Sequence, residues 1–358
     1  MSESDGDERK LPLFERYLTV WVLLAMAVGT GVGQAWPELS EALEGAAVGG
    51  INLIVAVLLW VIMVPMAARV ELSALLQVPK NPRALIVTTV VNWLVQPFAM
   101  YGLAVLFFRH IYSFSDEVAD AALAGAVLLG GSPCTALVFA WSELADGDPA
   151  YTLFQVALND VLILILYAPT AKLLLAIDDI PLPFTTLLAS VLLFVVVPFA
   201  IGFVLRRAVF GGDRERLATF QRRCSPWSQA ALLLMLVLIF LFQGSALVAT
   251  PLRVLAFAVP LCLQTVSMFV LAYGATYLLH IRHAEAAPAA FIASSNFFEL
   301  GVATSIALYG LDSPATLVNV VGVLVEVPVM LGLVKVANAT KGRFAKFEGD
   351  EKPSLSSA

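Results

Sequence analysis

The strongest constraint on this chain is a series of ten long apolar segments, each about the length at which a helix crosses the hydrocarbon core of a membrane. Inside a bilayer no water is available to the backbone, so such segments form helices that satisfy their own N–H and C=O groups. Seven of the ten contain no Asp, Glu, Lys or Arg. We therefore predict an all-α integral membrane protein with ten transmembrane helices. The predicted spans are residues 17–36, 49–68, 84–108, 121–142, 149–171, 180–205, 224–250, 254–279, 286–311 and 313–334.

The composition agrees with a membrane location and excludes a soluble globular protein and a disulfide-rich one. Hydrophobic residues make up 60% of the chain and charged residues only 13%, which is too apolar for a soluble globular protein. The first ten residues, MSESDGDERK, lack the apolar core of a signal peptide, so the first span is expected to stay in place. Three scattered cysteines, Cys134, Cys224 and Cys262, do not form a disulfide framework.

The distribution of basic residues predicts the orientation of the spans. With the N-terminus in the cytoplasm, 18 of the 21 Lys and Arg lie on the cytoplasmic side, and only Arg109, Lys172 and Arg253 lie outside. Lys and Arg are enriched in cytoplasmic loops of membrane proteins. The sequence therefore predicts a multi-pass protein of the cell (plasma) membrane with both termini in the cytoplasm.

The spacing of a repeated dipeptide indicates that the two halves of the chain are related. Cys134 precedes a Pro-Ala dipeptide (149–150) by 15 residues, and Glu299 precedes a second one (314–315) by 15 residues, so the two pairs are offset by 165 positions. Five spans per half is an odd number, so the second half must be inverted relative to the first, as in many secondary transporters. We predict two inverted five-helix repeats, 17–171 and 180–337, between cytoplasmic tails at 1–16 and 338–358.

Two of the predicted spans contain sequences that are unfavourable inside a helix. The fourth reads GGSPCT at 130–135, where glycine and proline weaken the backbone hydrogen bonding. The ninth reads SSNFFEL at 294–300, where Ser294, Ser295 and Asn296 offer side-chain partners to freed backbone groups. Non-helical backbone at membrane depth is tolerated where protein or a water-filled cavity covers it. We expect helices 4 and 9 to be broken and to cross near the midplane, although Gly-Ser-Pro is also compatible with a simple packing kink.

The cysteine in the first break has two possible roles. A free cysteine often behaves as a small buried hydrophobe, and this is the expected role of Cys224 and Cys262. Cys134, however, lies between polar neighbours, Ser132 and Thr135. Its thiolate is a soft ligand that favours soft metals and metalloids over hard cations.

Three carboxylic acids lie within predicted spans: Asp160, Glu299 and Glu326. Each costs about 2.5–3.5 kcal/mol to insert, so an intramembrane acid is by default a functional residue. No Lys or Arg lies at comparable depth, and burial then favours the neutral carboxyl, which can take up and release protons during transport. For Glu326 a structural hydrogen bond to a neighbouring helix is an equal alternative. Asn159 adds a second polar group beside Asp160.

Other residues in the spans have packing roles or line the interior. Trp141, Phe297 and Phe298 are candidates for the wall of a central cavity, with packing against lipid or helices as the alternative. Gly29, Gly31 and Gly33 are spaced as in closely packed membrane helices.

The string GGSPCTALVFAWSELADGDPAYTLFQVALND, together with SSNFFELGVATSIAL, resembles the Acr3 family of arsenite efflux permeases, part of the wider superfamily of ten-span carriers similar to bile acid/sodium symporters. The resemblance implies that Cys134 and Glu299 are required for arsenite transport, and that Trp141 and Asn159 are the motif's tryptophan and asparagine. Some relatives carry arginine before the cysteine; here the residue is Pro133, so a role for charge at that position is not expected.

The chemistry of arsenite agrees with the residues in the two breaks. Arsenite at neutral pH is a small, uncharged trihydroxide that binds thiols. One thiol with hydroxyl, amide and carboxyl partners suits a carrier that must release its substrate. The expected substrate-binding residues are Ser132, Cys134, Thr135, Asn296 and Glu299, and Glu299, Asp160 and Glu326 are expected to couple export to protons. Antimonite is a second candidate substrate.

Two alternatives to arsenite export follow from the sequence. A sodium-coupled organic-anion symporter of the wider superfamily would need cationic or dipolar partners for its substrate and several oxygen ligands for sodium. The predicted centre has a Cys and a Glu without basic residues, which disfavours this alternative. A membrane-embedded enzyme would need a catalytic constellation, but His110, His280 and His283 lie at span ends and no HExxH or GxSxG motif is present. We therefore expect a transporter that is not an enzyme and has no cofactor.

Overall fold

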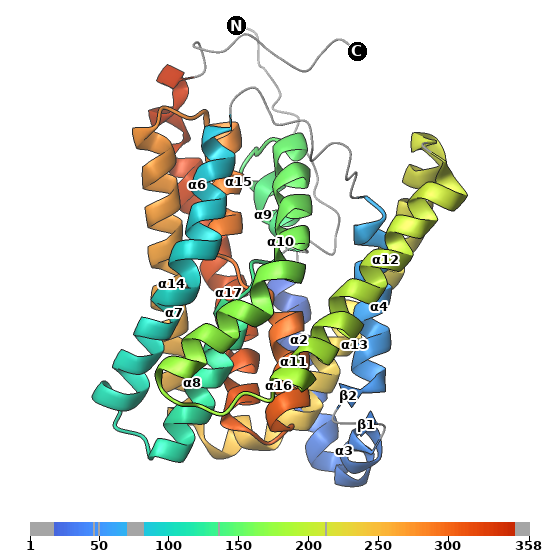
Figure 1. Cartoon of the computed structure of the whole chain (residues 1–358), viewed down its shortest axis with the longest axis vertical. Coiled ribbons are helices and arrows are strands. Elements are labelled where there is room, and N and C mark those ends of the chain that lie inside the picture. The colour runs from blue at the N-terminus through green and yellow to red at the C-terminus, as the bar shows by residue number, and fades with distance from the viewer. Residues whose placement is uncertain are drawn as a thin grey trace, which may run out of the picture.

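The structure, a computed structural model, describes residues 18–45, 47–48, 51–69, 82–134, 137–211 and 213–347. These residues are almost entirely helical (Figure 1). The exception is a short antiparallel pair, β1 (Ala47–Val48) and β2 (Ile51–Asn52). The first half of the chain contains α2 (Leu18–Ala35), α3 (Pro37–Glu44), α4 (Leu53–Ala67), α6 (Arg83–Val90), η1 (Val91–Val95), α7 (Gln96–Ala104), η2 (Val105–Ile111), α8 (Asp116–Gly130), α9 (Val138–Leu144) and α10 (Pro149–Ile177).

The described part of the second half is also helical. It contains α11 (Phe184–Val191), η3 (Leu192–Val196), α12 (Val197–Val204), η4 (Leu205–Phe210), α13 (Arg214–Ala249), α14 (Pro251–Leu278), α15 (His283–Ser294), α16 (Phe298–Tyr309) and α17 (Pro314–Thr340). Two 3₁₀ turns, η5 (Lys341–Arg343) and η6 (Ala345–Phe347), follow. The segments η1, η2, η3 and η4 are π-helical turns that continue the neighbouring α-helices without a break in the chain.

Seven helices among the described residues are long and apolar enough to cross a membrane. They are Arg83–Ile111, Pro149–Ile177, Phe184–Phe210, Glu215–Gly244, Pro251–Leu278, His283–Tyr309 and Pro314–Arg343. Two shorter apolar helices, Val20–Ala35 and Leu53–Ala67, accompany them. The predicted span at 121–142 is divided between α8 and α9. The chain is thus a multi-pass helical membrane protein.

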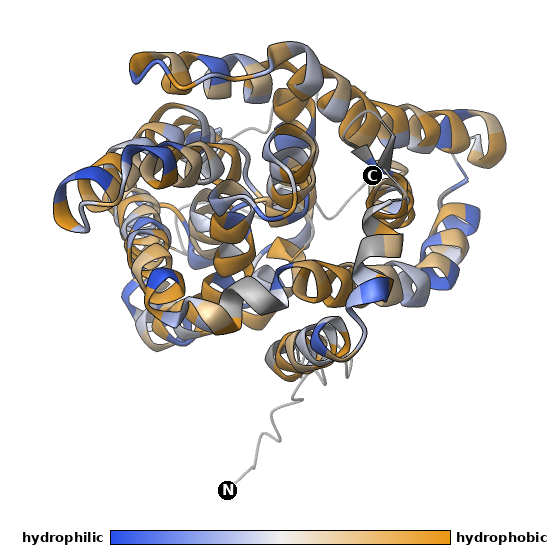
Figure 2. Cartoon of the chain, turned by 90° about the horizontal axis from the view of Figure 1, so that it is seen from below, coloured by the Kyte–Doolittle hydropathy of each residue, from blue (hydrophilic) through white to orange (hydrophobic). Residues whose placement is uncertain are grey.

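The outer surface of the helices is apolar. Large hydrophobic side chains such as Leu94, Leu252 and Val270 are more than half exposed, and Figure 2, in which many helices are seen nearly end-on, shows hydrophobic residues over much of the periphery. Polar residues such as Gln96 and Asn319 are instead fully buried. This distribution is that of a protein whose surroundings are lipid and whose interior contains the polar groups.

The repeated Pro-Ala dipeptide has a local structural explanation. Asp148 caps α10 by accepting hydrogen bonds from the backbone N–H groups of Ala150 and Tyr151, and Pro149 occupies the first helical position. Ser313 caps α17 in the same way, accepting from Ala315 N–H, with Pro314 in the first position. A polar cap followed by proline is a favourable helix start, because proline lacks an N–H that would otherwise be unpaired.

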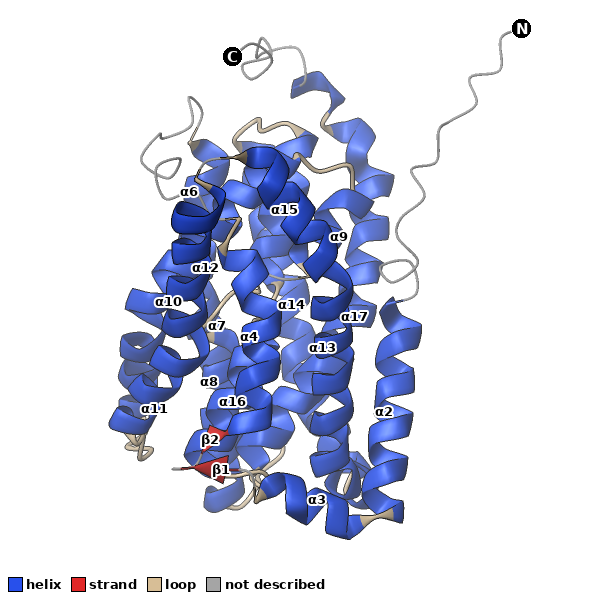
Figure 3. Ribbon diagram, turned by 90° about the vertical axis from the view of Figure 1, so that its right-hand side faces the viewer, coloured by secondary structure: helices blue, strands red, loops and turns tan. Residues whose placement is uncertain are grey.

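The helices form two neighbouring groups. In one group α2, α4 and α12 are held together by contacts of α13 with α2 and α4 and of α12 with α4 (Figure 3). In the other, α14 packs against α15 and α17, and α8 packs against α7, α16 and α17. Both breaks predicted from the sequence lie in this second group.

Glycines allow α2 to approach α13 closely, as the sequence predicts for two of three positions. A Cβ atom on Gly29 would overlap the carbonyl oxygen of Val237, and one on Gly33 would overlap that of Leu241. Gly31 is different, because a Cβ there meets no described atom within 4 Å. The packing prediction is therefore wrong for Gly31, which lies on another face of α2.

Gly33→Ala is expected to destabilise the protein by about 1–3 kcal/mol, because the added methyl group forces α2 away from the rigid backbone of α13. Gly31→Ala is the matched control and should be neutral or slightly stabilising, since alanine is the better helix former by up to about 1 kcal/mol. Thermal unfolding of the purified protein in detergent measures both changes. Equal melting temperatures for the two variants would contradict the assignment of Gly33 to the helix interface.

Candidate functional site

The two helix breaks meet inside the protein. The first separates α8, which ends at Gly130, from α9, which begins at Val138. The second separates α15, which ends at Ser294, from α16, which begins at Phe298. The backbone N–H of Phe297 donates a hydrogen bond of 2.9 Å to the carbonyl oxygen of Ser132. Non-helical backbone from one break thus satisfies non-helical backbone from the other, as membrane depth requires.

The glycine before the first break permits close packing. A Cβ atom on Gly130 would lie 2.7 Å from the Cβ of Met100 on α7. Pro133 lies three residues after the end of α8 and has no N–H to donate. A larger residue at 130 would push α7 away from the break, so the glycine is required by this contact.

The serines of the second break act as the sequence predicts. Ser294 Oγ donates to the carbonyl oxygen of Ala290 at 2.8 Å, and Ser295 Oγ donates to that of Ile292 at 3.3 Å. The carbonyl of Ile292 belongs to the last four residues of α15, where intrahelical partners run out, whereas Ala290 lies one residue before them. The hydroxyls therefore stabilise the end of the half-helix.

Asn296 is the centre of a buried network that joins four helical segments. Its backbone N–H donates to Glu326 Oε1 at 3.2 Å, and its side-chain Nδ2 donates to Gln264 Oε1 at 3.1 Å. Its Oδ1 accepts from Gln96 Nε2 at 2.8 Å, and Gln96 also donates to the carbonyl oxygen of Ser295. The side chain of Asn296 thus bonds to two other amides rather than to freed backbone groups.

Gln96 and Gln264 are not among the residues predicted from the sequence. A signal was nevertheless present: each is a lone glutamine in the apolar part of a span, one in each half of the chain. They are 168 positions apart, close to the offset of 165 between the two breaks. Applying the repeat to every polar residue in the spans would have found both.

Glu299 lies in the first turn of α16 and is completely buried. Among the described residues, neither of its carboxyl oxygens has a hydrogen-bond partner, and none of the ion pairs includes it. The positive end of the helix dipole favours the charged carboxylate, whereas burial favours the neutral acid. Glu326 on α17 reaches the same break, because its Oε1 accepts a hydrogen bond from the backbone N–H of Asn296, three residues before Glu299.

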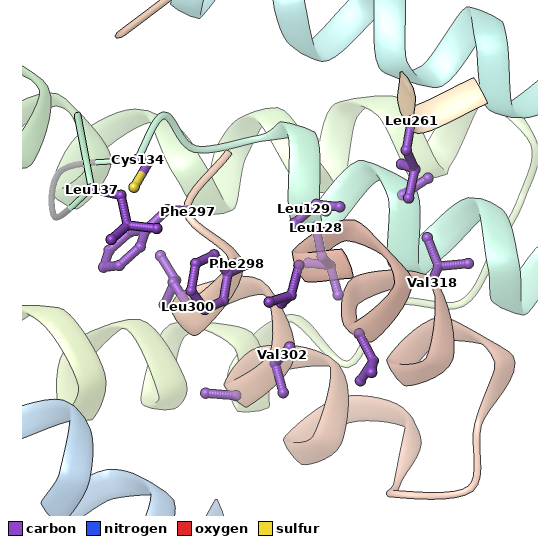
Figure 4. Close-up of a cluster of buried hydrophobic side chains, with 14 of the residues drawn as sticks. Leu128, Leu129, Cys134, Leu137, Leu261, Phe297, Phe298, Leu300, Val302 and Val318 are labelled. Carbon is purple, nitrogen blue, oxygen red and sulfur yellow. The ribbon is translucent and has the colours of Figure 1, made fainter. Parts of the chain in front are cut away.

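Cys134 is fully buried beside the apolar residues of both breaks. It belongs to the same cluster as Leu137 and Phe297, and Figure 4 shows these side chains near one another, with Phe298 beyond them. Phe297, Phe298 and Trp141 are at most 2% exposed, which excludes lipid contact for all three. Thr135, the other predicted partner of arsenite, lies outside the described residues.

Two buried hydrogen-bonding groups lie in or beyond the first break. Ser132 Oγ and Trp141 Nε1 are buried and have no partner within the described ranges. An unpaired buried donor is costly, so such groups in a native protein serve a water or a ligand. The carboxyl oxygens of Glu299 are likewise buried without a described partner.

The remaining predicted residues lie on α10. Asn159 is fully buried, and its Oδ1 accepts a hydrogen bond of 3.3 Å from Trp93 Nε1 on η1. Asp160 follows it and is 2% exposed. On α17, Glu326 occupies a position 166 residues later and reaches the second break directly.

Comparison with known proteins agrees with the motifs. Residues 56–250 match the model of the Sodium Bile acid symporter family. The chain is 44% identical to the arsenical-resistance protein Acr3 of Alkaliphilus metalliredigens, over 92% of this chain and 94% of that protein. It is 38% identical to an uncharacterised transporter of Synechocystis, over 92% of this chain and 90% of the relative. It is 30% identical to the arsenical-resistance protein Acr3 of Corynebacterium glutamicum, over 91% and 89%.

These relatives cover nearly the whole chain, including both breaks and the carboxylic acids between and after them. They are transporters, so the enzyme alternative no longer applies. The polar interior, the interrupted helices and the apolar exterior described above are those of a carrier. The chain therefore belongs to the Sodium Bile acid symporter family and, within it, to the Acr3 arsenical-resistance proteins.

Proposed function

We propose that this protein exports arsenite from the cytoplasm across the plasma membrane in exchange for protons. The observation that supports this most strongly is the hydrogen bond between Phe297 and Ser132, because it joins the break that contains Cys134 to the break that leads into Glu299. A thiol and a carboxyl on two crossing breaks provide a soft ligand and a proton carrier at one place. Two relatives that span almost the same length are arsenical-resistance proteins.

The binding step uses the thiol of Cys134. Its S–H bond breaks as one As–OH group leaves, the proton and hydroxide combine as water, and an arsenic–sulfur bond forms. Hydroxyls that stay on arsenic then bond to Glu299, Ser132 and Asn296, with Thr135 as a further partner. Because only one thiol holds the arsenic, water can reverse the exchange and release the substrate on the outer side.

The coupling step uses Glu299. From the cytoplasm, arsenite displaces the proton of Glu299 as it binds, since an ionised carboxylate accepts hydrogen bonds from arsenic hydroxyls. On the outer side, reprotonation weakens binding and returns the empty carrier. Glu326 and Asp160 relay this proton or adjust the charge on Glu299, while Trp141, Asn159, Phe297 and Phe298, with Pro133 at the break, support the cavity.

The proposed architecture is a ten-span bundle of two inverted repeats, 17–171 and 180–337, with helices 4 and 9 crossing. The matching caps of α10 and α17 and the paired breaks support the repeat. The basic residues of the sequence place both tails, 1–16 and 338–358, in the cytoplasm. Alternating access then follows from movement of one helix group relative to the other.

Arsenite uptake into everted membrane vesicles tests the proposal. The vesicle interior corresponds to the outside of the cell, so an acidic interior is expected to accelerate arsenite uptake, and vesicles without the protein should show no acceleration. Antimonite, which has the same thiol chemistry, is expected to compete. Uptake could instead be independent of the pH gradient and driven by an imposed sodium gradient, with a bile acid as a better substrate. That result would favour the organic-anion alternative.

A further inference from the structure

A row of buried polar side chains runs along the interface of α6, η1 and α7 with α10 and α15. These elements lie together in Figure 1 and contact one another. We call the set the polar row. It consists of Thr88, Asn92 and Gln96 on one side and Tyr151, Gln155 and Asn159 on the other.

The spacing of the row places each set on one face of its helix. Tyr151, Gln155 and Asn159 are four residues apart on α10, which brings their side chains one above another. Thr88, Asn92 and Gln96 follow the same spacing through the π-turn η1, where the N–H of Gln96 bonds to the carbonyl oxygen of Val91.

Hydrogen bonds connect the two sides at successive levels. Thr88 Oγ1 and Tyr151 OH are 2.8 Å apart. One level further, Gln155 Nε2 donates to Thr89 Oγ1 at 3.3 Å, and beyond it Trp93 donates to Asn159. The row ends at Gln96, which bonds to Asn296 and through it reaches Glu326.

Several polar atoms of the row have no hydrogen-bond partner among the described residues. Both amide atoms of Asn92, Oε1 of Gln155, Nδ2 of Asn159 and Oε1 of Gln96 are buried without a partner among the residues described. All four side chains are fully buried. An unsatisfied amide in a native interior is costly, and water molecules are the usual partners of such groups.

The neighbouring helix α15 offers few polar partners. It contacts α6, η1 and α10, and five of its ten buried residues are alanines, among them Ala286, Ala289, Ala290 and Ala293. Alanine has no polar side-chain atom, and its methyl group occupies little volume. Water molecules, which fit beside such small side chains, are therefore suitable partners for Asn92.

The row also has a direction. Tyr151 lies two residues inside the start of α10, at the end predicted to face the cytoplasm, whereas Gln96 lies at the second break. The proposed antiport needs a way for the proton to leave the central carboxyls toward the cytoplasm. The row connects those two places.

We propose that the polar row binds a file of water molecules that carries protons between the Asn296–Glu326 contact and the cytoplasm. This inference rests on the proposed proton exchange. In the inward-facing protein the O–H bond of the Glu326 carboxyl breaks and its proton passes to the first water. The last water then releases a proton to the cytoplasm. One carboxyl loses one proton and the cytoplasm gains one. The amides do not ionise; they hold the waters in place, and the hydroxyls of Thr88 and Tyr151 extend the file.

Asn92→Leu tests the inference, because leucine has the same branched skeleton of heavy atoms but bonds no water. Two rates are measured in vesicles: arsenite uptake driven by a pH gradient, and exchange of labelled for unlabelled arsenite at equal pH, which moves no net proton. Driven uptake is expected to fall at least about tenfold, the effect of about 1.4 kcal/mol on a limiting barrier. Exchange should stay close to that of the wild type, because the proton that one arsenite molecule displaces can stay on Glu326 and return to Glu299 when that molecule leaves, without passing along the row.

Gln243→Leu is the matched control. Gln243 is also a buried glutamine whose amide atoms have no described partner, but it lies on α13 in the other helix group. This variant should retain both rates. If Asn92→Leu does not fold, Gln155→Met and Asn92→Ser replace it, and the serine, which keeps a water-binding hydroxyl, should be the more active of the two.

The outcomes separate the inference from the proposed function. Wild-type protein that shows no pH-driven uptake would contradict the proton exchange itself. Wild-type coupling together with undiminished driven uptake in folded Asn92→Leu and Gln155→Met would overturn the polar row. Equal loss of driven uptake and exchange in these variants, or the same loss in Gln243→Leu, would also overturn it, because the row would then act on arsenite or on folding.

Discussion

Cells whose only copy of this protein carries Cys134→Ser are expected to lose arsenite resistance. Serine is close to cysteine in size and still forms hydrogen bonds, but its oxygen is a hard ligand that does not hold arsenic as sulfur does. Loss of even a supporting group around a metal commonly lowers affinity 10- to 100-fold, so loss of the only thiol at the site should lower export by about a hundredfold or more. Arsenite uptake into vesicles measures this directly.

The two other cysteines are the controls for that result. Cys224 and Cys262 are only partly buried, on α13 and α14, and neither lies in a helix break. Serine at either position should leave uptake close to that of the wild type. Full arsenite resistance with Cys134→Ser, at normal protein levels, would contradict direct binding through its thiol.

Glu299→Gln is expected to abolish export driven by a pH gradient while leaving the protein folded. Glutamine has the shape of the protonated acid and cannot release a proton, so the carrier should bind arsenite more weakly and lose its coupling. Because a positioned proton carrier typically contributes about a hundredfold to a rate, driven uptake should fall by a factor of this order. Uptake in vesicles with and without an acidic interior measures the loss.

The shorter acid at this position should retain part of the activity. Glu299→Asp keeps a titratable carboxyl but withdraws it from the ligand, so partial, still pH-dependent uptake is expected. If Glu299→Gln continued to accelerate with the gradient, the proton would have to bind elsewhere. Asp160, also buried and also on a helix of the second group, would then become the candidate.

The break positions could be predicted from sequence because their causes are local. Gly130, Pro133 and the serines at 294 and 295 weaken a helix or cap it wherever they occur, and the structure interrupts both helices at these residues. Exposure of aromatic residues could not be predicted in the same way. The sequence left lipid contact open for Phe297 and Phe298, and burial was decided by the meeting of two segments about 165 residues apart.

The polar network shows the same limit more clearly. Asn296 was identified, but its partners Gln96 and Gln264 come from spans whose relative position no local pattern reveals. The sequence predicted that Asn296 would bond to freed backbone groups. In the structure its side-chain amide bonds to the side chains of Gln96 and Gln264 instead. Hydropathy finds the helices, but the rotation of each helix about its axis decides which polar groups meet.

X-ray absorption at the arsenic edge, on purified protein incubated with arsenite, tests the central claim most directly. The account predicts one sulfur neighbour to arsenic in the wild-type protein and in a variant with serine at both 224 and 262. It predicts only oxygen neighbours in Cys134→Ser. An arsenic–sulfur bond that persists in Cys134→Ser, or one that disappears when the other two cysteines are replaced, would contradict the proposed site.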